Sequence, residues 1–189
     1  MLDRLRSSLQ SYLTGVGKAF SKVGLSPTAW TAVGLVVSVI AAAFYATSAS
    51  YGEVLGGVLV LVAGWFDIVD GAVARVTGKT SSRGAFLDST LDRVAEVALF
   101  LGILIGGFAP PDFVLLSLSL SLLVSYTRAK GDALGVTLSG VGIGERSERL
   151  LVLAVSSLVG LVYWGVLIVA ILAGYTFLER VYRAAKALK

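Results

Sequence analysis

Five acidic residues gather between positions 67 and 96 of a chain that is otherwise strongly apolar: Asp67, Asp70, Asp88, Asp92 and Glu96. Asp67 and Asp70 are three residues apart, and Asp88 and Asp92 are four apart, so each pair shares one face of a helix. Two antiparallel helices joined by a short loop would bring the pairs together, where like charges repel unless a cation lies between them. Oxygen-only ligands favour Mg²⁺ or Mn²⁺, which complete their coordination with water and phosphate oxygens.

Two other interpretations of this acidic cluster compete with a metal site. The acids could pair with Arg75, Arg83 and Arg93 merely to hold the helices together, but they outnumber the cations that can reach them. They could also bind ions for passage in a cation transporter. Transporters often repeat their halves around helices broken at mid-membrane, whereas these acids occupy a single hairpin with no matching cluster elsewhere. We therefore favour a metal site.

The composition indicates whether the chain folds in water or in a membrane. Hydrophobic residues make up 56% of the chain and charged residues 15%, with a mean hydropathy of +0.86. A soluble domain carries roughly 25% charged residues, so this chain cannot cover a water-facing surface. Cysteine and histidine are both absent, which excludes disulfides, Ser-His and Cys-His catalysis, and zinc bound by either residue. We expect an all-α membrane protein with no nucleic-acid partner.

The apolar runs predict six transmembrane helices. A bilayer core of about 30 Å needs roughly 20 helical residues. The predicted spans are 28–48, 53–75, 85–107, 112–130, 148–164 and 165–180. The last two are separated only by a tight break that we place near Trp164 and Gly165, because the apolar run there is nearly continuous.

The basic residues predict the orientation of these spans. All 16 of them fall on one side of the six-span arrangement, while the opposite loops carry only Glu53 and Asp112. Loops rich in Lys and Arg stay cytoplasmic. We therefore expect an integral, multi-pass cell membrane protein with both termini and the active site on the cytoplasmic side.

Residues 1–26 predict an interfacial amphipathic helix that precedes a six-helix domain over residues 27–189. Apolar residues recur at three- and four-residue spacing, with the basic residues off that stripe: Leu2, Leu5, Leu9, Leu13, Val16, Phe20 and Val23. Such a basic amphipathic helix lies in the interface and prefers anionic headgroups. Gly15 and Gly17 weaken the helix and are the positions at which it could break. The helix either anchors the topology or guides a substrate, and the sequence does not separate these roles.

A second cluster of cations lies in the cytoplasmic segment between the fourth and fifth spans. Arg128 and Lys130 end one span, and Arg146 and Arg149 open the next at a spacing of three. Four cations opposite a metal site favour an anionic acceptor such as a sugar or polyol phosphate. Alternatively they serve only as topology signals, paired with Asp132, Glu145 and Glu148. The glycine-rich run at 140–144 follows no strand, so we interpret it as a flexible turn rather than a nucleotide loop.

Between Asp67 and Asp92 the chain reads D-x2-D-G-x2-A-R-x8-G-x3-D-x3-D. This string resembles the signature of the CDP-alcohol phosphatidyltransferases at all eight fixed positions. The likeness extends to the six-helix plan, the amphipathic helix and the Ser26-Pro27 start of the first span, where Thr28 replaces a frequent Asn. The resemblance implies transfer of a phosphatidyl-type group from a CDP-linked lipid to an alcohol, with release of CMP, and family precedent implies a homodimer.

The resemblance also assigns roles to residues. Asp67, Asp70 and Asp88 would hold two Mg²⁺ or Mn²⁺ ions, and Asp92 would be a further ligand or the general base. The positions expected to contact the CDP moiety are Thr31, Asp70, Gly71, Ala74, Arg75, Thr80 and Gly84. Small-xxx-small pairs at Gly52 and Gly56 and at Gly102 and Gly106 are candidate helix-pairing surfaces in the expected dimer.

Two shorter motifs flank the second basic segment and are similar to the inositol-phosphate-using branch of the family. They are S-Y-x-R-A-K from Ser125 and G-I-x-E-R-x-E-R-L from Gly142. By this likeness the donor group is archaetidyl or phosphatidyl, and the acceptor is a soluble phosphorylated alcohol. Its phosphate would be bound by Ser125, Tyr126, Arg128, Lys130, Arg146 and Arg149. Glycerol phosphate or serine remains an alternative acceptor for the same chemistry.

Overall fold

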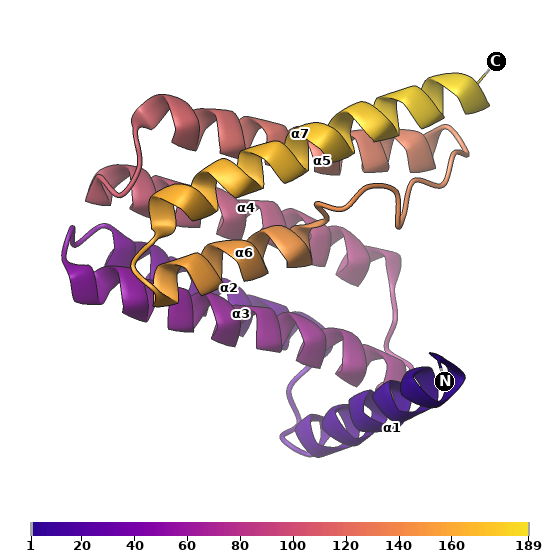
Figure 1. Cartoon of the computed structure of the whole chain (residues 1–189). Helices are drawn as coiled ribbons and strands as arrows, with labels where there is room; N and C mark the ends of the chain where they lie inside the picture. The colour runs from indigo at the N-terminus through magenta and orange to yellow at the C-terminus, as the bar shows by residue number, and fades with distance from the viewer. Residues whose placement is uncertain (1, 189) are drawn as a thin grey trace.

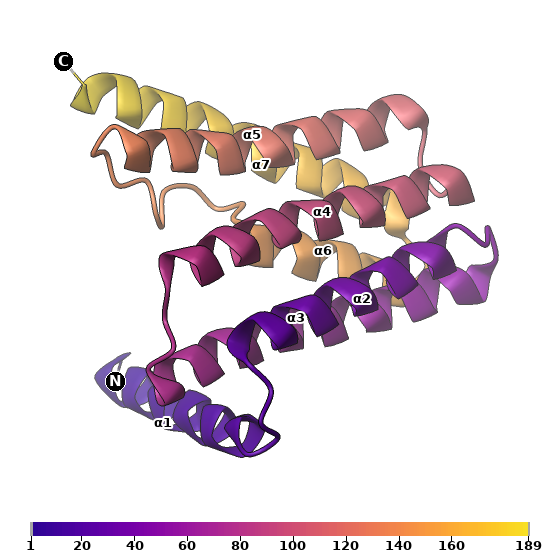
Figure 2. The ribbon, with the colours of Figure 1, turned by 180° about the vertical axis from the view of Figure 1, so that it is seen from behind.

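A computed structural model describes residues 2–188, which form seven helices and no strand (Figure 1). The helices are α1 (Leu2–Ser21), α2 (Pro27–Tyr45), α3 (Ser50–Thr77), α4 (Ser82–Gly106), α5 (Pro111–Ala133), α6 (Arg146–Leu158) and α7 (Val162–Ala187). Helices α2 to α7 form an elongated bundle, and α1 lies across its end, where α2 begins and α3 ends (Figure 2). The starts of α4 and α6 and the ends of α5 and α7 point toward that same end of the bundle.

Four helices of the described chain are long and apolar enough to cross a membrane: α2, α3, α5 and α7. The prediction of an all-α membrane protein is therefore confirmed. Helix α4 has the length of a span but carries five charged residues among its first fifteen: Arg83, Asp88, Asp92, Arg93 and Glu96. Helix α6 has 13 residues, about 20 Å at the rise of an α-helix, which is shorter than the hydrocarbon core. Six crossings therefore stay a prediction.

The break between the last two helices comes earlier than predicted. Helix α6 ends at Leu158, and Gly160 adopts a left-handed φ of +73°. Gly160 N donates to the Ser157 carbonyl at 3.2 Å and Leu161 N donates to that of Ser156 at 2.8 Å, the hydrogen-bond pair of a Schellman motif. A break at Trp164 and Gly165 was thus wrong, because Gly160 supplies the positive φ. Helix α7 continues to Ala187, seven residues beyond the predicted end of the last span, and the remaining predicted span ends differ from the observed ones by at most three residues.

Helix α1 continues through Gly15 and Gly17 without a break. A Cβ atom on Gly17 would lie 2.6 Å from the carbonyl oxygen of Ala72, which shows that Gly17 lets α1 approach the α3 backbone closely. Along the apolar stripe, Leu13, Val16 and Phe20 are partly buried, and Val23 is exposed. The side chains of Leu2, Leu5 and Leu9 lie outside the described residues. Helix α1 therefore packs against the C-terminal part of α3, next to the acidic motif.

The glycine pairs predicted as dimer surfaces pack inside the bundle instead. A Cβ on Gly102 would overlap the carbonyl oxygen of Ala42, and one on Gly106 would overlap that of Tyr45, so these glycines join α4 to α2. Gly52 and Gly56 likewise meet Phe44 and Tyr45 and join α3 to α2. The assignment of these pairs to a dimer surface was wrong. Sequence spacing identifies a close helix contact but not the chain that provides it.

Gly102→Ala should therefore destabilise the protein. The added methyl group meets backbone rather than a movable side chain, and overpacking of this kind costs about 1–3 kcal/mol. Gly64→Ala is the matched control, because its Cβ meets nothing within 4 Å on the neighbouring helix α3 and alanine is the better helix former. Thermal unfolding in detergent should show a lower Tm for the first variant only. Equal Tm values would contradict the packing of α4 on α2.

Candidate active site

The acidic residues are brought together by the hairpin of α3 and α4. Helix α3 ends at Thr77 and is capped by Gly78, which has a φ of +65°, a conformation that suits glycine. Ser81 then caps α4, its Oγ accepting a hydrogen bond from Gly84 N at 3.0 Å. Because α3 leads into the hairpin and α4 leads out, Asp67 and Asp70 near the end of one helix face Asp88 and Asp92 near the start of the other.

Three of the four aspartates form a cluster suited to a divalent cation. Carboxylate oxygens of Asp67, Asp70 and Asp88 all lie within 4.8 Å of one another. Asp70 Oδ2 and Asp88 Oδ1 are buried without a hydrogen-bond partner in the described chain. A buried carboxylate oxygen without a partner is unfavourable, and a cation between these oxygens would satisfy both. The donor set, all oxygen, fits Mg²⁺ or Mn²⁺.

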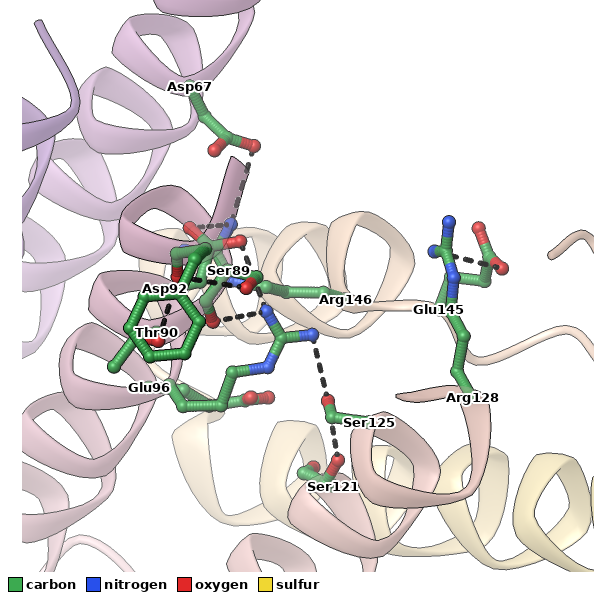
Figure 3. A network of polar contacts seen from close by, with 12 residues as sticks. Asp67, Ser89, Thr90, Asp92, Glu96, Ser121, Ser125, Arg128, Glu145 and Arg146 are labelled. Atoms are coloured by element: carbon green, nitrogen blue, oxygen red, sulfur yellow. Dashed lines mark hydrogen bonds and ion pairs between the residues drawn. The ribbon is translucent and has the colours of Figure 1, made fainter. Parts of the chain in front are cut away.

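Asp92 stands beside this cluster and is held by two arginines. Its Oδ1 contacts Arg146 Nη1 at 2.9 Å and its Oδ2 contacts Arg93 Nη1 at 3.5 Å. Arg146 Nη1 also donates to Asp67 Oδ2 at 3.3 Å, so one guanidinium links α3, α4 and α6 (Figure 3). Both oxygens of Asp92 are thus paired with cations of the protein, whereas Asp70 Oδ2 and Asp88 Oδ1 have no partner in the described chain.

A cavity of about 1110 Å³ opens next to the aspartates, between α4, α5, α6 and α7. Of the six residues predicted to bind the acceptor phosphate, Ser125, Tyr126, Arg128 and Arg146 line it. Lys130 is exposed and does not line it. Arg149 borders the cavity, but its side chain is 1% exposed and donates to Glu96 and to the Gly144 carbonyl.

The residues predicted to contact the CDP moiety surround the other side of the cluster. Thr31 and Asp70 line a small second cavity that also reaches Asp67, Asp92 and Arg146. Further along α3, the guanidinium of Arg75 lies over Gly71, 3.4 Å from where a Cβ would be. Ala74 is partly buried, Thr80 is exposed in the loop that follows α3, and Gly84 packs on Ser81 Oγ. None of these five residues, Gly71, Ala74, Arg75, Thr80 and Gly84, lines either cavity.

Two further arginines line the large cavity and were not among the predicted site residues. Arg93 Nη2 donates to Ser125 Oγ at 3.1 Å, which connects α4 to α5. Arg180 is 1% exposed and donates to Glu145 Oε1 at 2.8 Å. Sequence analysis treated Arg93 only as an ion-pair partner and Arg180 as a topology signal. The available signal was their position, since an arginine within a membrane helix is costly unless it has a role.

The glycine-rich loop before α6 is hydrogen-bonded to α7. The N–H groups of Ile143 and Gly144 donate to Thr176 Oγ1 at 3.2 and 2.9 Å. Arg180 donates to the Val141 carbonyl at 3.0 Å, so α7 holds the loop at several points. These hydrogen-bond partners lie more than 30 residues away in sequence, so the loop sequence alone does not reveal them.

The fold and site together define a membrane-embedded enzyme that uses a divalent metal and acts on phosphorylated substrates. Residues 25–181 match the CDP-alcohol phosphatidyltransferase family, and the chain belongs to that family. It is 37% identical over 190 residues to the archaetidylinositol phosphate synthase of Pyrococcus horikoshii, covering 100% of this chain and 99% of that protein. It is 39% identical over 176 residues to the phosphatidylinositol phosphate synthase of Streptomyces avermitilis, covering 85% and 68%.

Solved structures of the phosphatidylinositol phosphate synthase of Mycobacterium tuberculosis share the fold. The structure with CDP-DAG bound superposes with a TM-score of 0.79 at 27% identity, over 91% of this chain and 92% of that one. The structure in complex with manganese and citrate has a TM-score of 0.80 at 28% identity, over 91% and 88%. Membership in the family confirms the predicted enzyme class. It therefore favours the enzyme over the cation transporter.

Proposed function

We propose that this enzyme transfers an archaetidyl or phosphatidyl group from a CDP-linked lipid to inositol phosphate and releases CMP. The observation that carries the proposal is that the carboxylate cluster of Asp67, Asp70 and Asp88 adjoins a large cavity. Asp67 and Asp88 line this cavity together with several arginines. A metal cluster suits the diphosphate of a CDP-linked donor, and an arginine-lined cavity suits a phosphorylated acceptor. The names of the relatives support this pairing of substrates.

On the donor side, Asp67, Asp70 and Asp88 would hold one or two Mg²⁺ or Mn²⁺ ions. Bound metal ions neutralise phosphate charge and orient the leaving group in this kind of chemistry. Thr31 and Asp70 border the small cavity where the CDP moiety would begin. We propose five further contacts with the CDP moiety, which lie from the last turns of α3 to the start of α4: Gly71, Ala74, Arg75, Thr80 and Gly84.

On the acceptor side, we propose that Asp92 serves as the general base. It is the carboxylate that borders both cavities and lies outside the three-residue cluster. Its carboxylate would take the proton from the acceptor hydroxyl as the new phosphorus–oxygen bond forms and the bond to CMP breaks. Arg146 and Arg93 contact its two oxygens and hold the carboxylate in one orientation. Should Asp92 ligate metal instead, the same arginines would orient that ligand.

The acceptor phosphate would be bound by Arg128 and Arg146, with Ser125 and Tyr126 beside them. We expect Arg128→Gln to raise the KM for inositol phosphate about tenfold, since a hydrogen bond to a charged group contributes about 1.5–3 kcal/mol. The KM for the CDP-linked lipid should not change. Lys130→Gln is the matched control, because Lys130 is also exposed and two residues away but outside the cavity. Equal effects of the two substitutions would contradict the phosphate site.

The acceptor itself is tested by comparing inositol phosphate, glycerol phosphate, free inositol and serine with one CDP-linked lipid and Mn²⁺ or Mg²⁺. The arginine-lined cavity predicts that a phosphorylated acceptor is preferred and that free inositol and serine are poor. Preference for serine or free inositol would refute the phosphate pocket, and preference for glycerol phosphate would keep the pocket but replace the proposed acceptor.

The proposal includes the arrangement in the membrane. We propose that α2 to α7 form a six-span domain over residues 27–189, with residues 1–26 as its interfacial segment, and that the protein is a homodimer. Both termini and the active site would face the cytoplasm. In support, the two chain ends lie at the same end of the bundle as the starts of α4 and α6, which carry the site (Figure 2).

A further inference from the structure

Two charged side chains that the mechanism above does not use are buried against each other between α4 and α6. Glu96 and Arg149 are each 1% exposed. Arg149 Nε and Nη2 donate to Glu96 Oε1 at 3.2 and 2.7 Å, and Nη1 donates to the carbonyl oxygen of Gly144 at 2.7 Å. All three nitrogens of the guanidinium group therefore donate hydrogen bonds to the protein, so the group is not free to bind a substrate.

This buried pair lies one helical turn from the site on both helices. Glu96 follows Asp92 by four residues and Arg149 follows Arg146 by three, so each couple shares a helix face. The contact between Asp92 and Arg146 at 2.9 Å and that between Glu96 and Arg149 at 2.7 Å are thus successive bridges between the same two helices. The backbones of α4 and α6 pack on each other only sparsely, whereas α6 packs well on α3 and α7. Polar side chains therefore carry much of the α4–α6 connection at this end.

Stability alone does not account for such a pair. Removing two charges from water costs about as much as their attraction returns, and well-packed apolar residues are often equally stable in their place. Glu96 Oε2 is buried without a partner in the described chain, so the pair is not fully satisfied either. What an arginine–carboxylate pair does supply is geometry, because the planar fork fixes distance and direction.

The residue that needs this geometry is Arg146. It is the first residue of α6, and helix ends fray unless they are held. Arg149 holds the start of α6 on both sides of Arg146. It lies one helical turn after Arg146, and it donates a hydrogen bond to the carbonyl of Gly144, two residues before Arg146. Thr176 Oγ1 accepts from Gly144 N at 2.9 Å and secures the same residue against α7.

We infer that Glu96 and Arg149 are positioning residues, which hold Arg146 against Asp92 and so set the geometry of the base and the acceptor phosphate. This inference rests on the proposed function. It also gives Arg149 a role different from the phosphate contact that its spacing suggested. The pair acts through Arg146 and does not itself touch substrate.

Kinetics on a stable variant test the inference. In the double variant Glu96→Leu with Arg149→Met, both charges are replaced by apolar side chains, and we expect the Tm to stay near that of the wild type. The kcat/KM for inositol phosphate should nevertheless fall by about ten- to a hundredfold, the scale of a 1 Å misplacement, while the KM for the CDP-linked lipid stays unchanged. Arg149→Lys, which keeps the charge but not the fork, should be similarly impaired. Arg183→Lys, in the exposed pair with Glu179, is the matched control. Wild-type kinetics in the folded double variant would overturn the inference.

A distance measurement tests the same inference without activity. The chain has no native cysteine, so spin labels can be attached through Leu101→Cys on α4 and Leu151→Cys on α6, whose side chains are both exposed. We expect a narrow distance distribution with Glu96 and Arg149 present and a broad or shifted one in the double variant. An unchanged narrow distribution would overturn the positioning role. If the wild type used no CDP-linked lipid, the proposed function would fail, and the spin-label distances would still decide whether the pair fixes α4 against α6.

Discussion

Asp70→Asn and Asp88→Asn should each lower CMP formation by at least about a hundredfold. Even residues that only hydrogen-bond to a metal ligand contribute about ten- to a hundredfold to metal affinity or activity, and a ligand itself should contribute at least as much. These two carboxylates have oxygens that are buried without a partner and lie within 4.8 Å of the other acids of the cluster. An amide offers one weaker oxygen ligand in place of two charged ones. The measurement is the initial rate of CMP release in detergent, with the Tm of each variant recorded alongside.

Asp112→Asn is the matched control for these variants. Asp112 lies at the start of α5, at the far end of the bundle from the site, so the same substitution there should leave the rate unchanged. Raising the Mn²⁺ concentration should restore part of the activity of the two cluster variants. It should leave the rate of the control unchanged. Near-normal rates in either cluster variant at low Mn²⁺ would exclude a metal role for that carboxylate.

Asp92→Asn should have the second large effect, a fall in kcat of about 10²–10⁴-fold, the usual contribution of a general base. The asparagine keeps the size of the side chain and can still accept a hydrogen bond from Arg146, but it cannot take the proton of the acceptor hydroxyl. The KM for both substrates should change little, because Asp92 lies between the donor and acceptor cavities and is the main contact of neither. Steady-state kinetics with each substrate varied in turn provide the measurement.

Mn²⁺ affinity separates the two roles proposed for Asp92. If Asp92 is the base, Asp92→Asn should bind Mn²⁺ as the wild type does, as followed by electron paramagnetic resonance of the free ion. A loss of affinity equal to that of Asp70→Asn would make Asp92 a metal ligand instead. A normal kcat with normal Mn²⁺ affinity would contradict both roles.

The acidic half of the site could be predicted from sequence because its geometry is local. Asp67 and Asp70 share a helix face through their spacing, and Asp88 and Asp92 do so on the next helix, which only a short loop separates. Ser81 and Gly78 mark the ends of the two helices with ordinary capping chemistry. Spacing and caps together leave one arrangement for a hairpin, and the structure has it.

The basic half could not be resolved in the same way, because partners distant in sequence decide it. Arg146 and Arg149 lie on one helix face and are equivalent by spacing, yet the guanidinium of Arg149 is buried against Glu96, 53 residues away. Glu96 itself appeared to be one more acid of the metal motif. In the same way, nothing local shows that Gly102 meets Ala42 of its own chain rather than another copy. Such choices between equivalent residues depend on tertiary packing.

The most direct test of the whole account is the joint formation of CMP and lipid product by the purified wild-type enzyme. With Mn²⁺, a CDP-linked lipid and inositol phosphate, the account predicts equimolar CMP and a lipid that carries the inositol phosphate by a new phosphodiester bond. Both products should disappear when the acceptor is omitted or when the metal is chelated. Formation of CMP without an acceptor, or formation of lipid product that persists after chelation, would contradict it.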